Sequence, residues 1–162
     1  MSDLISCRIA EKSDLSEILR LYAQPDIDDG KVLSQLEAED IFERISRYPN
    51  YKIYVAVFEG KIVGTFTLLI MENLGHMGAP SAIIEDVAVD PDFQRHGTGK
   101  TMMKYALGIA NEQGCYKAML SSNLKRKLAH KFYESLGFDR HGYSFLVKSQ
   151  QGAETDARKQ HR

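Results

Sequence analysis

The segment Gln94–Lys100 reads Gln-Arg-His-Gly-Thr-Gly-Lys and combines two glycines with three basic side chains. Where such a segment joins a strand to a helix, unpaired backbone N–H groups lie near the positive end of the helix dipole and bind phosphate well. Gly97 and Gly99 allow an anion to approach the backbone, and Arg95 and Lys100 add positive charge. The segment lacks the full glycine patterns of a P-loop and of the dinucleotide fingerprint. By itself it predicts either a pyrophosphate-binding loop or an ordinary tight turn.

Two acidic residues, Glu85 and Asp86, precede this loop within a predicted strand at residues 81–89. Side chains alternate between the two faces of a strand, so only one of these carboxylates is expected to face a reacting group. Glu85 is then expected to share a face with Val87 and Val89. A carboxylate at this place can accept a proton, hold a substrate or form a salt bridge.

The elements that must position these residues follow from hydrophobic periodicity and from glycine and proline breaks. Ser34 and Glu37 predict a capping box for one helix, and Glu59 and Gly60 predict the turn of a hairpin. The predicted order is βααβββαβαβ, which is an α/β fold with a mixed sheet. Strands are predicted at 4–10, 51–58, 61–71, 81–89, 115–121 and 143–148, and helices at 14–22, 34–48, 98–113 and 124–136.

The composition bounds the class of protein. With 162 residues and 43% hydrophobic content, the chain predicts a single domain over residues 1–148 with a real core, followed by a polar, disordered tail at 149–162. A net charge of −1 favours neither nucleic acid nor a membrane as a partner. No leader or long apolar run is evident, which predicts a cytoplasmic protein. Cys7 and Cys115 lack metal-site spacing, so we expect buried thiols and no metal.

Two motifs, in order along the chain, extend the interpretation of the loop. The sequence Val-Ala-Val-Asp-Pro at 87–91, followed by Gln94-x-x-Gly97-x-Gly99, resembles motif A of the GNAT family of N-acetyltransferases. Ser-Asn at 122–123 and Ala-His-Lys-Phe-Tyr-Glu-Ser-Leu-Gly-Phe at 129–138 are similar to motif B of that family. The resemblance covers residues 4–148 and implies an acetyl-CoA-dependent N-acetyltransferase with the GNAT-like fold and its splayed central strands.

The resemblance assigns a coenzyme site. It implies that pantetheine lies in the gap between the strands at 81–89 and 115–121 and pairs with the backbone of Val87 and Val89. A splayed edge does offer unpaired backbone groups to an extended ligand. Asn123 is then either a pantetheine contact or a helix cap, and Arg126 either a coenzyme A phosphate contact or a solvated helix residue. The residues implied to hold the pyrophosphate are Arg95, His96, Gly97, Thr98, Gly99, Lys100 and Thr101.

The resemblance also implies the catalytic residues. Tyr133 resembles the tyrosine that protonates the departing thiolate, since a phenol with a pKa of about 10 stays protonated at neutral pH; the alternative is a core tyrosine beside Phe132. Glu85 is the expected proton acceptor, and Asp86 is a candidate substrate contact. The N–H of Val87 is expected to meet the oxyanion of a direct attack, with no acyl group on the enzyme.

The acceptor is bounded less closely. Residues 84–89 with 114–117 look like the glucosamine-6-phosphate N-acetyltransferases, and residues 122–126 with 129–133 are similar to aminoalkylphosphonate N-acetyltransferases. Both imply a small amine that carries a phosphorus oxyanion, for which His76, Arg44 and Arg47 are candidate contacts. A protein or peptide N-acetyltransferase and a non-catalytic acyl-CoA-binding module remain alternatives. Many relatives pair across this region, so a homodimer is expected through the apolar stretch 67–71.

Overall fold

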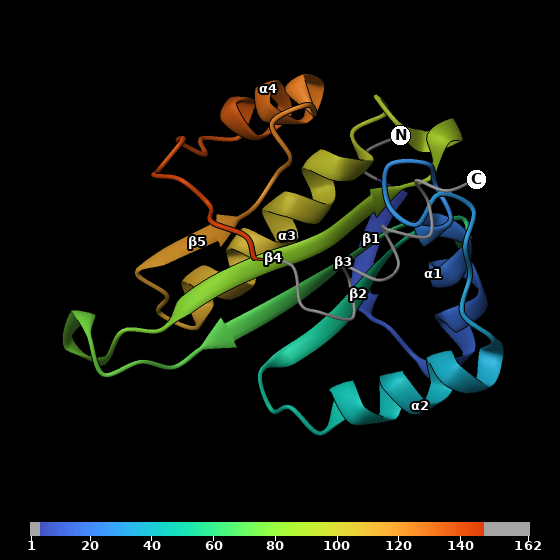
Figure 1. Cartoon of the computed structure of the whole chain (residues 1–162), viewed down its shortest axis with the longest axis horizontal. Helices are drawn as coiled ribbons and strands as arrows, with labels where there is room; N and C mark the ends of the chain where they lie inside the picture. The colour runs from blue at the N-terminus through green and yellow to red at the C-terminus, as the bar shows by residue number, and fades with distance from the viewer. Residues whose placement is uncertain (1–3, 148–162) are drawn as a thin grey trace. The chain divides into compact units, whose positions relative to one another are not determined.

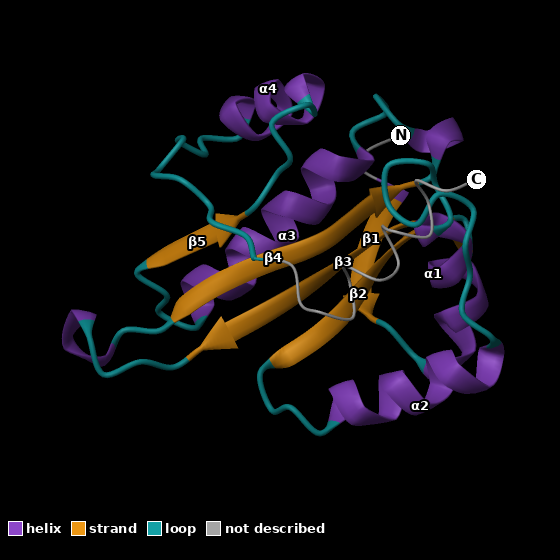
Figure 2. Cartoon of the chain, viewed as in Figure 1, coloured by secondary structure: helices purple, strands orange, loops and turns teal. Residues whose placement is uncertain are grey.

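The computed structural model describes residues 4–147, and the predicted tail lies outside the described residues. The chain divides into two compact units, Met1–Arg126 and Lys127–Arg162. The first unit holds a mixed sheet with helices α1, α2 and α3 (Figures 1 and 2). The second unit holds α4, Lys127–Ser135. The expected α/β architecture is therefore confirmed.

The sheet has the strand order β1-β2-β3-β4-β5. The first four strands are antiparallel neighbours, and β5 runs parallel to β4. Glu59 and Gly60 both have positive φ, at 48° and 78°, as a tight hairpin turn between β2 and β3 requires. The strands are β1 (Ile5–Ile9), β2 (Tyr51–Phe58), β3 (Lys61–Met71), β4 (Ser81–Val89) and β5 (Lys117–Leu120).

Helices α1 (Leu15–Tyr22) and α2 (Gln35–Ser46) precede the hairpin in the chain. The predicted capping box is present, because the N–H of Glu37 donates to Ser34 Oγ at 3.3 Å and the N–H of Ser34 donates to the Glu37 carboxylate at 2.9 Å. A core cluster joins α1 to one face of the sheet. Its buried members include Ile18, Leu21, Ile53, Val55 and Ala88.

Helix α3 (Thr98–Glu112) packs on the opposite face. Tyr54 stacks on Phe66, its cross-strand partner, with ring centroids 5.0 Å apart, and its edge meets Tyr105 of α3 at 5.8 Å. A Cβ atom at Gly64 would lie 2.5 Å from the Met102 sulfur, so this glycine allows α3 to approach the sheet closely. The first unit therefore has three layers, with β3 and β4 between α1 and α3.

The final predicted strand is not observed. Residues 143–147 have no regular secondary structure, and Tyr143 is 92% exposed, while Lys148 lies outside the described residues. Its aromatic and β-branched composition is typical of a strand, but a strand forms only when another strand edge accepts its backbone hydrogen bonds. The predicted order ending in β is thus wrong for the residues that the structure describes.

Candidate active site

Strands β4 and β5 separate halfway along their length. They pair only from Ser81–Ile84 to Lys117–Leu120, whereas β4 continues to Val89. Among the described residues no strand lies against this side of residues 85–89, which confirms the splay. On its other edge, the N–H of Asp90 donates to the carbonyl of Val63 at 2.9 Å. In an antiparallel ladder that pairing turns the N–H and C=O of Val89 toward the open side, where an extended ligand can meet the N–H group.

A side chain that the sequence did not suggest already lies at this open edge. The Gln24 amide, just after α1, donates to the carbonyl of Val89 at 3.3 Å and to that of Leu21 at 2.8 Å. The Gln94 amide donates to the same Val89 oxygen at 3.4 Å. The Val89 carbonyl therefore accepts two side-chain amides, one from a residue that precedes β4 in the sequence and one from a residue that follows it. No local motif marks Gln24, because the contact spans 65 residues of sequence.

A β-bulge interrupts β4 at the two acidic residues. Thr67 of β3 faces Glu85, and Thr65 faces Ala88, so three steps on β4 match two on β3. Asp86 has a φ of 52°, which few non-glycine residues adopt. Thr65 and Thr67 point to the same face of the sheet, and residues paired across a ladder point to the same face as each other. Glu85 therefore shares a face with Ala88, and the expectation that it shares one with Val87 and Val89 is wrong.

Both carboxylates lie on the α1 side of the sheet. Ala88 belongs to the core cluster that α1 covers. Glu85 shares a face of β4 with Ala88, so Glu85 also lies on the α1 side. The negative charge of Asp86 adds to burial in raising the pKa of Tyr22, the last residue of α1. Burial and then the charge of Asp28, in the loop after α1, raise the pKa of Asp86. The N–H of Asp28 donates to the Tyr22 carbonyl at 3.1 Å, which ties that loop to the end of α1.

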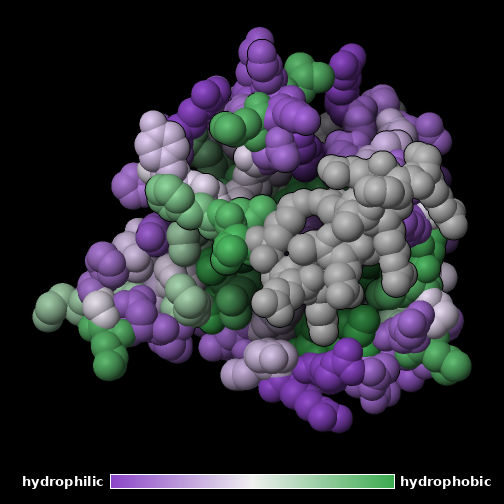
Figure 3. Space-filling view, in the orientation of Figure 1, coloured by the Kyte–Doolittle hydropathy of each residue, from purple (hydrophilic) through white to green (hydrophobic). Residues whose placement is uncertain are grey.

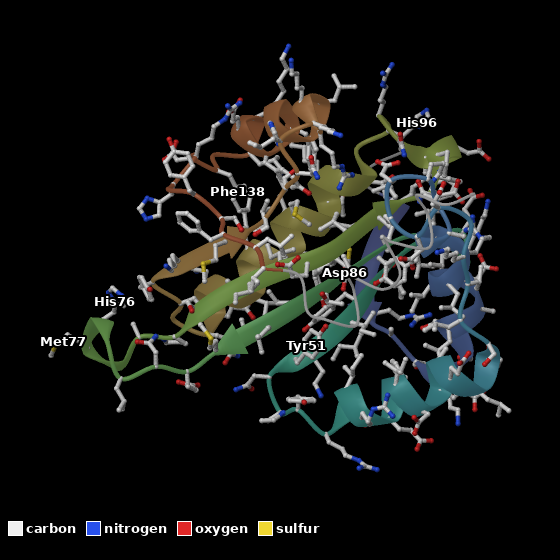
Figure 4. All side chains as sticks on the ribbon, in the orientation of Figure 1. Tyr51, His76, Met77, Asp86, His96 and Phe138 are labelled. Atoms are coloured by element: carbon white, nitrogen blue, oxygen red, sulfur yellow. The ribbon has the colours of Figure 1, made fainter. Side chains whose placement is uncertain are left out.

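The electrostatics suit a proton acceptor. Partial burial, and then the neighbouring charge of Asp86, raise the pKa of Glu85. Both residues nevertheless remain accessible to solvent. A carboxylate whose pKa moves toward neutrality is a stronger base for an ammonium proton, and it is still ionised at pH 7 when the shift is modest. Figure 4 shows Asp86 at the middle of the sheet and Tyr51 at the start of β2.

The predicted phosphate loop leads directly into α3. Gly97 is the residue before the helix and has a φ of 89°, and Arg95 also has a positive φ of 62°. Thr98 is buried and its hydroxyl donates to the Phe93 carbonyl at 2.9 Å, so this side chain holds the loop rather than facing outward. The side chains of Arg95, His96 and Lys100 are exposed.

The backbone of this loop is available for an anion. Within residues 4–147, the N–H groups of residues 95–100 donate to no protein acceptor, whereas Thr101 donates to the Gly97 carbonyl at 2.9 Å. Such a run of unpaired donors at a helix N-terminus, with basic side chains around it, fits a pyrophosphate group. The hydroxyl of Thr101 lies in the first turn of α3.

Asp90 anchors the start of the loop. It is 3% exposed, and its carboxylate accepts from Arg20 at 2.9 Å and from the N–H of Asp92 at 3.0 Å, with Lys61 Nζ 3.6 Å away. Burial alone would raise the pKa of Asp90, but the Asp92 N–H and the two cations outweigh it and lower the pKa. The guanidinium of Arg20 also donates to the Ile62 carbonyl. Arg20 thus ties α1 to both β3 and the loop.

His76 is not brought to the carboxylates. It lies in a 3-10 turn between β3 and β4, and its ring stacks on Tyr116 with centroids 4.0 Å apart. Figure 4 shows it well away from Asp86, beyond the opposite end of β4. Arg44, another candidate contact for the acceptor's oxyanion, pairs with Asp40 one turn earlier in α2.

Asn123 and Arg126 follow β5. The Asn123 side chain accepts from the N–H of Lys125 at 2.9 Å, which closes a turn ahead of α4 and does not cap the first turn of that helix. Arg126 pairs with Asp26 of the loop after α1 at 3.4 Å. A coenzyme contact for either residue stays a prediction.

Tyr133 belongs to the second unit, where it lies in α4. Its ring meets Phe132 at 5.2 Å and Phe138 edge-on at 5.9 Å. The carbonyl of Tyr133 also accepts from the N–H of Phe138 at 3.1 Å, which closes the helix end. These contacts hold the aromatic part of the side chain within motif B.

Neither cysteine suits nucleophilic attack. Cys7 and Cys115 are unpaired and half-buried. Burial raises the pKa of Cys7 to about 11, and burial with the charge of Glu72 raises that of Cys115. Both thiols therefore stay protonated at neutral pH. Over the described part of the chain there is no group of three or more metal-binding side chains, and no helix is long and apolar enough to cross a membrane.

The stretch proposed for a dimer interface is mostly internal. Strand β3 lies between β2 and β4, and Thr67, Leu68 and Ile70 are buried, while Met71 is 40% exposed. An apolar run in the middle of a sheet is core on both faces, which the sequence alone did not reveal. Exposed apolar side chains lie instead on the loop after β3 (Figure 3), where Leu74 and Met77 are fully exposed.

Comparisons with known proteins agree with this geometry. The family model described as "Acetyltransferase (GNAT) family" matches residues 14–138. The glucosamine 6-phosphate N-acetyltransferase of Trypanosoma brucei brucei is 33% identical over 144 residues, which cover 87% of this chain and 95% of that protein. More distantly, the aminoalkylphosphonate N-acetyltransferase of Salmonella typhimurium is 28% identical over 97 residues, 60% of this chain and 62% of the relative.

A solved structure is similar over nearly the same range. The putative acetyltransferase from Agrobacterium tumefaciens superposes with a TM-score of 0.84 at 34% identity, covering 89% of this chain and 99% of its own. The splayed strands, the open amides before α3 and both sequence motifs lie within the matched family region. The chain therefore belongs to the GNAT family of N-acetyltransferases, which use an acyl-CoA donor.

Proposed function

We propose that this protein transfers an acetyl group from acetyl-CoA directly to the primary amine of a small molecule, either an amino-sugar phosphate or an aminophosphonate. The observation that carries the proposal is the continuity of two half-sites in one strand-loop-helix unit. The open edge of residues 85–89 suits an extended amide-containing ligand, and the unpaired N–H groups of residues 95–100 suit its pyrophosphate. Glu85 lies on the same strand as that edge.

The proposed reaction assigns a step to each residue. Glu85 accepts a proton from the acceptor ammonium, and the neutral nitrogen attacks the thioester carbonyl. The N–H of Val87 stabilises the oxyanion. The N–C bond forms, the C–S bond breaks, and Tyr133 gives its proton to the departing thiolate. The new amide nitrogen releases its second proton to solvent, from which Tyr133 is reprotonated. The role of Tyr133 rests on the resemblance of motif B, and the role of Glu85 is supported by its raised pKa.

Two observations favour a small acceptor. Similar proteins with assigned activities include acetyltransferases named for glucosamine 6-phosphate and for aminoalkylphosphonates. In addition, the loop after α1 folds back onto that helix through the N–H groups of Asp28 and Gly30, which donate to the carbonyls of Tyr22 and Ala23. That loop borders the carboxylates on one side, whereas a peptide acceptor needs an open channel.

A thiol-release assay with acetyl-CoA and a panel of amines tests the proposal. The panel holds glucosamine 6-phosphate, aminomethylphosphonate and a lysine peptide. Turnover of a phosphorus-bearing amine above the peptide is expected. Preference for the peptide would establish the protein-acetyltransferase alternative, and tight coenzyme binding without any turnover would establish the binding module.

A Tyr133→Phe variant tests the general acid. The expected result is a fall in kcat of about 100-fold with little change in coenzyme affinity, since only the proton donor is removed. Tyr143→Phe is the matched control, because Tyr143 is 92% exposed and makes the same chemical change. Wild-type turnover by Tyr133→Phe would refute the assignment.

The same proposal includes a homodimer, a single catalytic domain over residues 1–148 and a cytoplasmic location. With residues 67–71 largely internal, the exposed Leu74 and Met77 offer the apolar surface for pairing. Sedimentation of the wild type and of a Leu74→Ser, Met77→Ser double variant tests the dimer. A wild-type monomer at all concentrations would remove it.

A further inference from the structure

Three carboxylates on the α1 side of β4 lie close enough for their charges to interact. Asp86 and Glu85 lie at the bulge, and Asp28 lies on the loop tied to the end of α1. Burial is the larger cause of both raised pKa values, and to it the charge of Asp28 adds for Asp86 and the charge of Asp86 adds for Glu85. Within residues 4–147, no ion pair includes any of the three.

Two arginines of the same unit are engaged with other carboxylates. Arg20 of α1 binds Glu17 and Asp90, and Arg126 pairs with Asp26. Like charges held close together raise one another's energy, and this repulsion is relieved when a cation binds between them. The cluster therefore has the charge of a cation site.

A second, independent observation points to a ligand at the same place. Thr67 is only 3% exposed, and its hydroxyl has no hydrogen-bond partner in the structure. It faces Glu85 directly across the β3–β4 ladder, on the same face. The hydroxyl of Tyr22, next to the cluster, is buried as well and lies within hydrogen-bonding reach of Thr65. Buried polar groups are normally satisfied, so the unpartnered Thr67 hydroxyl beside these carboxylates indicates a polar ligand.

We propose that Asp28, Glu85 and Asp86 form a subsite for the acceptor's ammonium group and the atoms next to it, and that this subsite rejects amines with an anionic group on the adjacent carbon. The proposal rests on the proposed function and selects among its acceptors. In an amino-sugar phosphate the phosphate lies at the far end of the sugar ring from the amine, outside the cluster. In a 1-aminoalkylphosphonate the oxyanion is one carbon from the nitrogen and meets the carboxylates.

The hydroxyl groups beside the subsite also favour an amino sugar over an aminophosphonate. An amino sugar presents hydroxyl groups beside its amine, and these can pair with Thr67 and Tyr22 as donors or acceptors. A phosphonate oxygen can accept from those two hydroxyls, but it would have to do so within reach of three negative charges. The subsite therefore favours amines with neutral, hydroxylated or cationic surroundings.

An Asp28→Asn variant tests the subsite and leaves the proposed base, Glu85, unchanged. The ratio of kcat/KM for aminomethylphosphonate to that for glucosamine 6-phosphate is expected to rise about tenfold, since one repulsive charge at close range is removed. Asp29→Asn is the matched control, because it makes the same change at the next residue of the loop and its ratio should stay at the wild-type value. An unchanged ratio in Asp28→Asn would overturn the subsite while leaving the acetyltransferase proposal intact.

A binding measurement keeps the subsite testable if no amine is turned over. Calorimetric titration of coenzyme-saturated protein with 1,2-diaminoethane is expected to show about tenfold weaker binding in Asp28→Asn than in wild type or Asp29→Asn. That result without turnover would support the subsite and refute the proposed function. Equal affinity in all three proteins would refute the subsite.

Discussion

Asp86 and Asp90 lie four residues apart in the chain, and their surroundings shift their pKa values in opposite directions. Asp86 is accessible to solvent, and partial burial together with the charge of Asp28 raises its pKa. Asp90 is buried, binds Arg20 and Lys61, and has a lowered pKa. The difference separates the end of β4 that we propose binds the acceptor from an anchored end. A carboxylate that lacks a counterion can be neutralised by a cationic ligand, whereas one that has its cations fixes the loop that we propose as the pyrophosphate site.

The largest expected effect comes from the reactive end. A Glu85→Gln variant should lose about 100-fold or more in kcat/KM, since the amide cannot take the ammonium proton and general base catalysis is worth about that much. Steady-state thiol release measures the loss. The pKa of Glu85 is raised, so in wild type the activity should rise with pH through that raised pKa, and this acid limb should be lost in the variant.

Asp86→Asn is the companion measurement for the base. At the bulge both carboxylates lie on one face, so either can reach the same acceptor. A smaller loss, mainly in KM, is expected if Asp86 holds the substrate. Should Glu85→Gln keep wild-type turnover while Asp86→Asn loses it, the base would be Asp86.

The next effect comes from the anchored end. An Asp90→Asn variant should lose about 2 kcal/mol of unfolding free energy at pH 7, a discounted value because Arg20 is partly exposed. The pKa of Asp90 is lowered, so its contribution is present above the unfolded value and disappears as pH falls through the folded one. Urea unfolding of both proteins at pH 7 and at pH 3 checks this. A stability difference that persisted undiminished in acid would show that charge is not the cause.

Much of this contrast could be predicted from local sequence. The bounds of β4 are those expected, and the start of α3 at Thr98 follows from the glycines of the loop. The capping box of Ser34 and Glu37 is likewise a signal contained in four residues. Such features need only neighbouring residues for their physical cause, which is why motifs and periodicity report them.

The rest depends on residues far apart in sequence. The bulge at Asp86 is a mismatch of register between β3 and β4, and no pattern within β4 contains it. The approach of Asp28 to Asp86 spans the whole β2–β3 hairpin. Residues 143–147 have the composition of a strand without the pairing edge, and residues 67–71 look like an exposed interface until their two neighbouring strands are known. Tertiary pairing overrides local propensity in each case.

A smaller effect is expected on the free energy of unfolding, because the Asp86 carboxylate has no counterion among residues 4–147. Because the folded pKa of Asp86 is raised, its ionised form opposes folding above that pKa, and the penalty fades as pH falls. Asp86→Asn should therefore raise the unfolding free energy by about 0.5 kcal/mol at pH 7, a discounted value because solvent reaches Asp86, while activity falls. Thermal unfolding at pH 7 and pH 4 measures it. Asp29→Asn is the control, because Asp29 also has a positive φ, 51° against 52°, and asparagine suits both backbones equally. Equal stabilisation of the two variants would assign the gain to the backbone.

The smallest expected effect is on the pH profile of the reaction. Glu85 and Asp86 interact and titrate as a pair, and Asp28 adds negative charge that raises the pKa of Asp86. Asp28→Asn should move the acid limb of the kcat/KM profile to lower pH by a few tenths of a unit, since less negative charge makes the pair easier to ionise. The alkaline limb should stay, because it does not depend on Asp28. The shift should shrink in 1 M salt, where charges screen over about 3 Å, and be absent in Asp29→Asn. An acid limb that moved to higher pH would mean that Asp28 lowers the pKa of the pair and that the carboxylates at the bulge are not coupled as like charges.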